Sequence, residues 1–230
     1  ILCGASISCG VNKKRIISFE INREFIQACK AGDIKKVEEL LDYGVSPNAS
    51  DYKGYPGFYW AVQKGHLNIV KLLLDRGVDY RKCNVAIIIS SEAGFFKMLK
   101  FLVKRGFNIN ASVKYGSNSA IAHAAFKGHF KIVKYLIANG SNHIESAIIY
   151  AFNNKKTNKE KLIRYLLKQN FDVNFRDYNG RSILTHAILN YRKKWLILYL
   201  IKKGADIKTD YRNSPIETAV RIGEYDIVKL

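Results

Sequence analysis

The chain has 230 residues, 48% of them hydrophobic, which is enough to bury a continuous core in an elongated stack. Lysine and arginine number 38 and aspartate and glutamate number 19, so the formal net charge is +19, and this excess favours acidic proteins or other polyanions as partners. The longest apolar run, residues 195–201, is far shorter than the roughly 18 residues that span a bilayer, so no membrane span is predicted.

Residues 1–22 precede the regular part of the chain. Residues 2–7 are similar to residues 203–207, and the distance from Gly4 to Gly44 exceeds the regular spacing found further on. We therefore expect residues 1–22 to be the tail of a preceding unit followed by an extended link. The chain starts without methionine and stops within the apolar residues 227–230, so we expect it to be a window onto a longer protein.

From residue 23 onward, a unit of nearly constant length recurs, which indicates one supersecondary element stacked many times. A residue predicted to end a helix closes each unit, at intervals of 33, 29, 34, 30 and 34 residues: Gly44, Gly77, Gly106, Gly140, Asn170 and Gly204. The predicted units are residues 23–50, 51–82, 83–111, 112–142, 143–174, 175–208 and a truncated 209–230.

Each unit reads as two helices joined by a turn. The first helix carries small residues such as Ala61 and Ala187, which allow neighbouring helices to approach closely. The second carries apolar residues in adjacent pairs, a stripe wide enough for contacts with the units on both sides. In the last unit, Ser214, Pro215 and Glu217 fit a capping box at the start of a helix.

These residues resemble the ankyrin repeat family. The match is fullest at Asp51-Tyr-Lys-Gly54 with Gly65-His66, and Ser214-Pro-Ile-Glu217 stands where the family has Thr-Pro-Leu-His. The resemblance covers about residues 23–230 and implies an all-α solenoid of helix-turn-helix units with short β-hairpin fingers. The asparagine- and lysine-rich, shortened units look like those of large DNA viruses. No unit keeps the family's histidine in that motif, so we expect capping of the first helices to vary.

The spacing between the glycine that closes one unit and the small residue of the next predicts where fingers are reduced. It is 17, 13, 18, 11 and 17 residues along the chain. The third and fifth units are therefore predicted to have lost most of the finger.

No arrangement typical of an enzyme or a metal site is present. The cysteines, Cys3, Cys9, Cys29 and Cys83, form no Cys-x-x-Cys pair, and the histidines are spread over several units. His66 and His129 follow the turn glycine, where the resemblance implies a structural role. We expect neither catalysis nor a bound cofactor or metal.

Two columns of residues form the candidate contact surface, because in the ankyrin family these positions line the concave side. One column is tyrosine on the fingers, and the other is the residue just before the small residue of the first helix. The predicted partner-binding residues are Tyr52, Tyr55, Trp60, Tyr115, His123, Tyr178, Arg181 and His186. Exposed tyrosine is a favoured interface residue, but packing of the tyrosines on neighbouring fingers remains the alternative.

A second candidate surface is basic. Lysines in one inter-helix turn and cations in the next are predicted to merge into one basic ridge: Lys155, Lys156, Lys159, Lys161, Arg192, Lys193 and Lys194. Such a ridge attracts acidic proteins or nucleic acid, while a plain solvated face is the alternative.

The sequence thus favours a non-catalytic module for protein recognition, a scaffold or adaptor with a protein partner, and the net positive charge is compatible with an acidic one. A structural virion or assembly component and a polyanion or nucleic-acid binder are the alternatives. An intracellular, cytoplasmic location is expected, in the host cytoplasm or the virion if the protein is viral.

Overall fold

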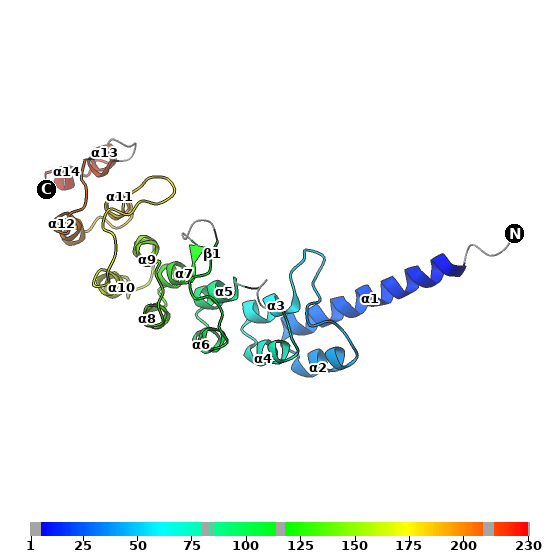
Figure 1. Cartoon of the computed structure of the whole chain (residues 1–230). Helices are drawn as coiled ribbons and strands as arrows, with labels where there is room; N and C mark the ends of the chain where they lie inside the picture. Colours follow the sequence, from blue (N-terminus) through cyan, green and yellow to red (C-terminus); the bar gives the residue numbers. More distant parts are fainter. Residues whose placement is uncertain (1–5, 80–82, 84, 114–117, 209–213, 230) are drawn as a thin grey trace.

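The computed structural model describes residues 6–79, 83, 85–113, 118–208 and 214–229. Its helices follow one another in pairs joined by short turns (Figure 1). The pairs are α1 (Ser6–Ala31) and α2 (Ile34–Asp42), α3 (Gly57–Lys64) and α4 (Leu67–Asp75), α5 (Val85–Ala93) and α6 (Phe96–Lys104), α7 (Ala120–Lys127) and α8 (Phe130–Ala138), α9 (Ile144–Ala151) and α10 (Lys159–Leu166), α11 (Ile183–Asn190) and α12 (Lys194–Lys202), and α13 (Pro215–Arg221) and α14 (Tyr225–Val228).

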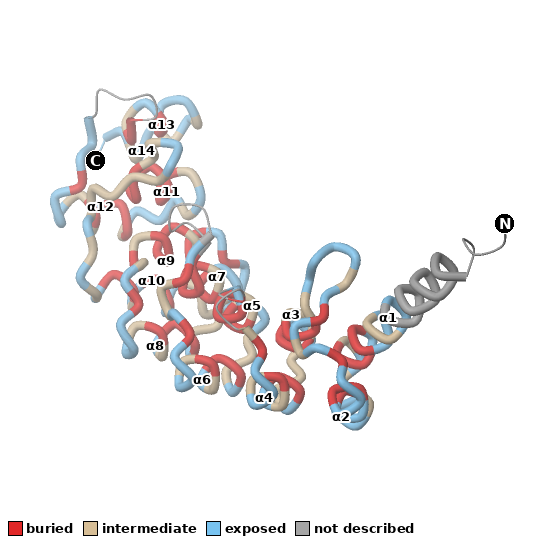
Figure 2. Tube along the Cα trace, turned by 45° about the vertical axis from the view of Figure 1, so that its right-hand side comes forward, coloured by how far each residue is buried: buried red, intermediate tan, exposed pale blue. Residues whose placement is uncertain are grey.

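The first helices of successive pairs form one continuous column. α1 packs on α3, α3 on α5, and so on through α11 and α13, so every unit is held mainly by its two neighbours. Figure 2 shows buried residues along this stack from the C-terminal part of α1 to α13. The all-α solenoid predicted from the repeats is confirmed.

The core follows the predicted pattern of small and paired apolar residues. The small side chains of the first helices are fully buried, as at Ala61, Ala124 and Ala187. On the second helices, adjacent apolar residues such as Ile132 and Val133 are both buried. Close approach of the first helices therefore depends on alanine and serine. The apolar stripe of α8 contacts both flanking units, since Tyr135 packs on Phe96 of α6 and Phe130 packs on Tyr165 of α10.

Strand structure among the described residues is confined to short fingers. β1 (Ser112–Val113) pairs antiparallel with β2 (Asn118–Ser119), and single bridges join Ser50 to Pro56 and Arg176 to Ser182. These fingers belong to the second, fourth and sixth units. Residues 139–143 alone connect α8 to α9. Residues 76–84, of which 80–82 and 84 lie outside the described residues, connect α4 to α5. Both links are shorter than the links that carry fingers, which confirms the prediction of reduced fingers in the third and fifth units.

Glycine ends the second helices as predicted, with one exception. Gly77, for example, follows α4 with φ of +82°, a left-handed conformation that costs glycine little. Asn170 is not left-handed, because α10 ends earlier, at Leu166. Ordinary turn hydrogen bonds from Lys168 to Tyr165 and from Gln169 to Leu166 close that helix. The prediction for Asn170 is therefore wrong.

The extended link expected within residues 1–22 is also wrong, because α1 is helical from Ser6 to Ala31. Neither glycine nor proline occurs in residues 11–31, so nothing in the local sequence interrupts the helix. The residues compared with the tail of a preceding unit lie partly outside the described residues, which start at residue 6.

Capping of the first helices varies from unit to unit. Ser119, Ser182 and Ser214 accept a hydrogen bond from the amide three residues later. Pro56 and His143 occupy the same position without a side-chain cap. Serine at the position of the motif's threonine thus caps three of the first helices, whereas α3 and α9 start without a side-chain cap.

Candidate recognition surface

Two of the fingers are built on an aspartate. In the sixth unit, one carboxylate oxygen of Asp177 accepts the backbone N–H groups of Asn179 at 2.8 Å and Arg181 at 2.9 Å. The other oxygen accepts Nε2–H of His186 at 2.9 Å. One side chain therefore closes the finger turn and joins it to α11.

The second unit repeats this construction with tryptophan in place of histidine. Asp51 accepts the backbone N–H groups of Lys53 at 2.9 Å and Tyr55 at 3.0 Å, and Nε1–H of Trp60 at 3.0 Å. Nζ of Lys30 lies 3.9 Å from the centre of the Trp60 ring. Asp51 and Asp177 thus fix the fingers of two units in the same way.

This geometry shows where two of the predicted contact residues lie. His186 is 8% exposed and Trp60 is half-buried. Each ring donates its N–H to a finger aspartate rather than pointing freely into solvent. Trp60 and His186 are therefore positioning residues that hold the fingers at a fixed angle to the first helices.

The Asp177–His186 pair has shifted pKa values on both sides. Burial raises the pKa of Asp177, but the hydrogen bonds from Arg181, His186 and Asn179 outweigh it, and the pKa falls below its usual value. Burial lowers the pKa of His186 even though Asp177 opposes this. A neutral imidazole bonded to an ionised carboxylate is the favoured form near neutral pH.

The finger tyrosines are the most accessible of the predicted contact residues. Tyr52 is 82% exposed and Tyr178 is 77% exposed, which argues against packing on a neighbouring finger. Tyr55 is 42% exposed and stacks on Tyr59 at 4.6 Å between ring centres. Tyr115 lies outside the described residues.

His123 and Arg181 complete the predicted set. His123 is half-buried, with Nδ1 3.5 Å from a carboxylate oxygen of Glu92 and its ring 6.0 Å from that of Tyr150. Arg181 is half-buried, and its Nε has no hydrogen-bond partner among the described residues. Both side chains lie on the same side of the stack as the fingers.

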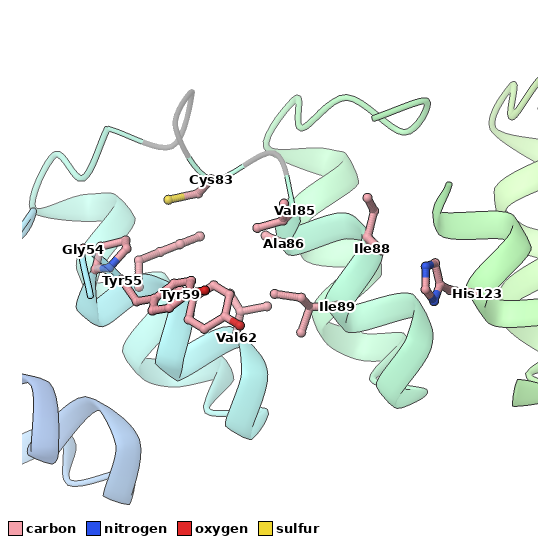
Figure 3. A pocket seen from close by; sticks show the side chains of 12 residues that line it. Gly54, Tyr55, Tyr59, Val62, Cys83, Val85, Ala86, Ile88, Ile89 and His123 are labelled. Atoms are coloured by element: carbon pink, nitrogen blue, oxygen red, sulfur yellow. The ribbon is translucent and has the colours of Figure 1, made fainter. Parts of the chain in front are cut away.

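Two hollows open where the third and fifth units lack a finger. The third-unit hollow, about 490 Å³, lies over α5 and is lined by Tyr55, Tyr59, Val62, Cys83, Ile89 and His123, among others (Figure 3). The fifth-unit hollow, about 670 Å³, lies over α9 and is lined by Phe126, Ile149, Tyr150, Phe175, Arg181 and His186, among others.

Two of the seven residues of the predicted basic ridge, Lys159 and Arg192, make contacts within the chain. Lys155, Lys156, Lys161, Lys193 and Lys194 are exposed. Lys159 instead donates to the Phe152 carbonyl and lies 4.7 Å from the Tyr191 ring, and burial lowers its pKa. Arg192 pairs with Glu224 at 3.1 Å.

Two histidines and two cysteines noted in the sequence are engaged in backbone contacts or packing. Nε2 of His66 lies 3.1 Å from the Lys30 carbonyl, and Nε2 of His129 lies 2.9 Å from the Glu92 carbonyl. Burial raises the pKa of the Cys29 thiol to about 12 and that of Cys83 to about 11, so both stay protonated.

In the part of the chain that the structure describes, no three histidine, cysteine, aspartate or glutamate residues gather as metal ligands. Within the same part, none of the helices combines the length and hydropathy needed to cross a bilayer.

Sequence reasoning missed Asp51 and Asp177, which carry the finger geometry. The available signal was the recurrence of Asp-Tyr-x-Gly in both units, with a ring N–H donor nine residues after each aspartate. It also missed Phe126 and Tyr150, which meet at 6.3 Å between ring centres in the fifth-unit hollow. No repeated pattern marks these two residues.

Family models match nearly the whole regular part of the chain. A model described as "Ankyrin repeats (many copies)" matches residues 25–74 and 77–137, and one described as "Ankyrin repeats (3 copies)" matches residues 121–211 and 148–230. The chain belongs to the ankyrin repeat family, whose repeats generally mediate protein–protein interaction.

Curated relatives share part of this region. "Ankyrin repeat, SAM and basic leucine zipper domain-containing protein 1" of Equus caballus is 32% identical over 103 residues, 41% of this chain and 22% of that protein. The Homo sapiens protein of the same name is 29% identical over 110 residues, 44% of this chain and 23% of that protein. The chain therefore spans less than a quarter of the length of these relatives.

Proposed function

We propose that this chain is a non-catalytic recognition module that binds a protein partner along its finger tips and first helices and serves as a scaffold or adaptor. The observation that carries the proposal is the pairing of exposed tyrosine with a fixed finger. Tyr52 and Tyr178 are each next to an aspartate that is hydrogen-bonded to the finger backbone and to a first helix. A large side chain presented on a rigid support loses little entropy on binding.

A test compares a finger tip with a finger support. Tyr178→Ala should leave the melting temperature nearly unchanged and weaken binding by about 1–2 kcal/mol if Tyr178 is a binding hot spot. Trp60→Ala should instead lower stability by about 2–3 kcal/mol, because it removes a half-buried ring and leaves Asp51 without that partner. The ligand is a peptide selected from a displayed random library on the immobilised chain.

Two outcomes of that comparison contradict the proposal. One is a Tyr178→Ala variant that melts several degrees lower and binds the selected peptide like the wild type. The other is a selection that enriches no peptide above an unrelated helical protein.

The basic ridge supports a second candidate, polyanion or nucleic-acid binding, through its exposed lysines. A variant with Arg192→Gln, Lys193→Gln and Lys194→Gln together should elute from heparin at clearly lower salt if the ridge binds polyanions. Unchanged elution would refute this function. Because Lys159 and Arg192 are engaged within the chain, we rank this candidate below protein recognition.

A structural role in a virion or assembly is the remaining alternative. It would be supported by many copies of the chain packed within a particle. For the recognition module we propose an intracellular, cytoplasmic setting and an acidic partner, the latter because of the net charge of +19.

A further inference from the structure

The two hollows have a common origin. Each lies over the first helix of a unit that has lost its finger, and a finger of an adjacent unit forms one wall. Tyr55 belongs to the finger of the second unit and borders the third-unit hollow. Phe175 and Tyr178 belong to the finger of the sixth unit and border the fifth-unit hollow.

The hollows meet at α7. His123 of this helix lines the third-unit hollow, and Phe126, one turn further on, lines the fifth-unit hollow. The ring of Tyr150 lies 6.0 Å from His123 and 6.3 Å from Phe126, so it connects the two. Among the described residues, the two hollows are thus neighbours that are bridged by His123, Tyr150 and Phe126.

The surface offers apolar contacts that remain partly open. Phe126 is 40% exposed, and Ile89, Tyr59 and Tyr150 are half-buried. Aromatic and aliphatic walls of this kind take bulky apolar side chains, which bury large area per residue.

The charges around the fifth-unit hollow determine the kind of segment that fits. Its described lining contains the cations Arg176 and Arg181 and one carboxylate, Asp177. Both oxygens of Asp177 already accept N–H groups, and the half-buried side chain of Arg181 lines the hollow without an ion pair to a carboxylate among the described residues. An incoming carboxylate can pair with Arg181 without competing with Asp177.

We infer that the two hollows together bind one extended, acidic segment of a partner protein, with a bulky apolar side chain in each hollow and a carboxylate paired with Arg181. The inference rests on the proposed recognition function and makes it specific. The loss of two fingers is then the feature that creates the binding path, since a finger in the third or fifth unit would stand over the hollow.

The test starts from peptides selected on the wild-type chain and measures their affinity for three variants. Ile89→Asn alters the third-unit hollow, Tyr150→Ala the fifth-unit hollow, and Arg181→Glu reverses the charge. Each should weaken binding at least about tenfold. Leu198→Asn on α12 and Lys104→Glu on α6 are matched controls on exposed residues of second helices, outside the hollows and the basic ridge, and should change affinity less than about twofold.

A charge exchange makes the assignment of Arg181 specific. Selected peptides should contain two bulky apolar residues and an aspartate or glutamate. Replacing that acid by lysine should weaken binding to the wild type and restore binding to Arg181→Glu. This rescue cannot come from a folding defect. Thermal melts check each variant, and Ile89→Thr and Tyr150→Leu replace any variant that fails to fold.

The outcomes separate this inference from the proposed function. If Tyr52→Ala weakens binding and the three hollow variants do not, the inference is overturned and recognition by the fingers stands. Enriched peptides that are basic, or that the charge exchange does not rescue, also overturn it. A selection without any enriched peptide overturns both.

Discussion

At the scale of single residues, the pair of Asp177 and His186 couples a finger to its first helix. Burial holds the pKa of His186 below its ordinary value of 6.5. As the pH falls below about 6.5, the unfolded chain binds a proton before the folded one does, so the folded state loses stability. The stabilising contribution of neutral His186 is complete above the pKa that this residue has in the unfolded chain. It is lost as the pH falls through the lower pKa that His186 has in the folded chain.

We therefore expect the melting temperature to fall between about pH 7.5 and about pH 5.5. His186→Gln should show a smaller fall, because glutamine can donate to Asp177 and does not titrate. His123 and His143, whose pKa values burial also lowers, account for the part that remains. An equal fall in both proteins, measured by circular dichroism, would show that His186 does not couple finger stability to pH.

Trp60 and His186 show why the candidate site was only partly predictable. Their position before the small residue of the first helix was correctly associated with the fingers. Whether such a residue faces a partner or holds the finger depends on how the finger folds back over nine residues. That fold is a property of the assembled unit. The sequence pattern therefore predicts which positions lie beside the fingers, but not the direction in which each ring points.

At the scale of elements, the turns between paired helices stack on one another. Gly128 ends α7 with φ of +76°, and a Cβ there would lie 2.9 Å from Nδ2 of Asn154 and 2.9 Å from Cγ of Lys156. Nδ2 of Asn158 donates to the Gly128 carbonyl at 2.9 Å. The longer turn of the fifth unit, residues 152–158, is thus packed on the turn of the fourth.

This packing predicts a difference between two glycines with similar backbone strain. Gly128→Ala and Gly140→Ala should each cost about 1–2 kcal/mol for the left-handed conformation. Gly128→Ala should cost about 1 kcal/mol more, because its methyl group must displace the next unit. Gly140 has no atom within 4 Å of the corresponding position.

Urea unfolding of the two variants measures this difference. Equal losses would mean that the turn of the fifth unit moves aside freely, and that residues 152–158 do not stabilise the contact between the fourth and fifth units.

At the scale of the whole molecule, the repeats made most of the fold predictable. A closing glycine recurs in the complete units except the fifth, paired apolar residues recur along the second helices, and the intervals between these features show which fingers are reduced. α1 was not predictable in this way, because residues 8–22, which form much of it, have no counterpart in the repeats. Asn170 was misassigned because its spacing fits the pattern although α10 ends at Leu166. The hollows depend on absent fingers, which no single residue marks.

The central claim is that a partner binds on the side of the fingers and first helices. Photo-crosslinking tests it most directly. A benzophenone amino acid replaces Tyr178 on a finger, or Tyr43, a 76% exposed tyrosine at the end of the second helix α2. Each protein is irradiated with a selected peptide. The account predicts a crosslink from position 178 and none from position 43. Crosslinking from position 43 alone would contradict it.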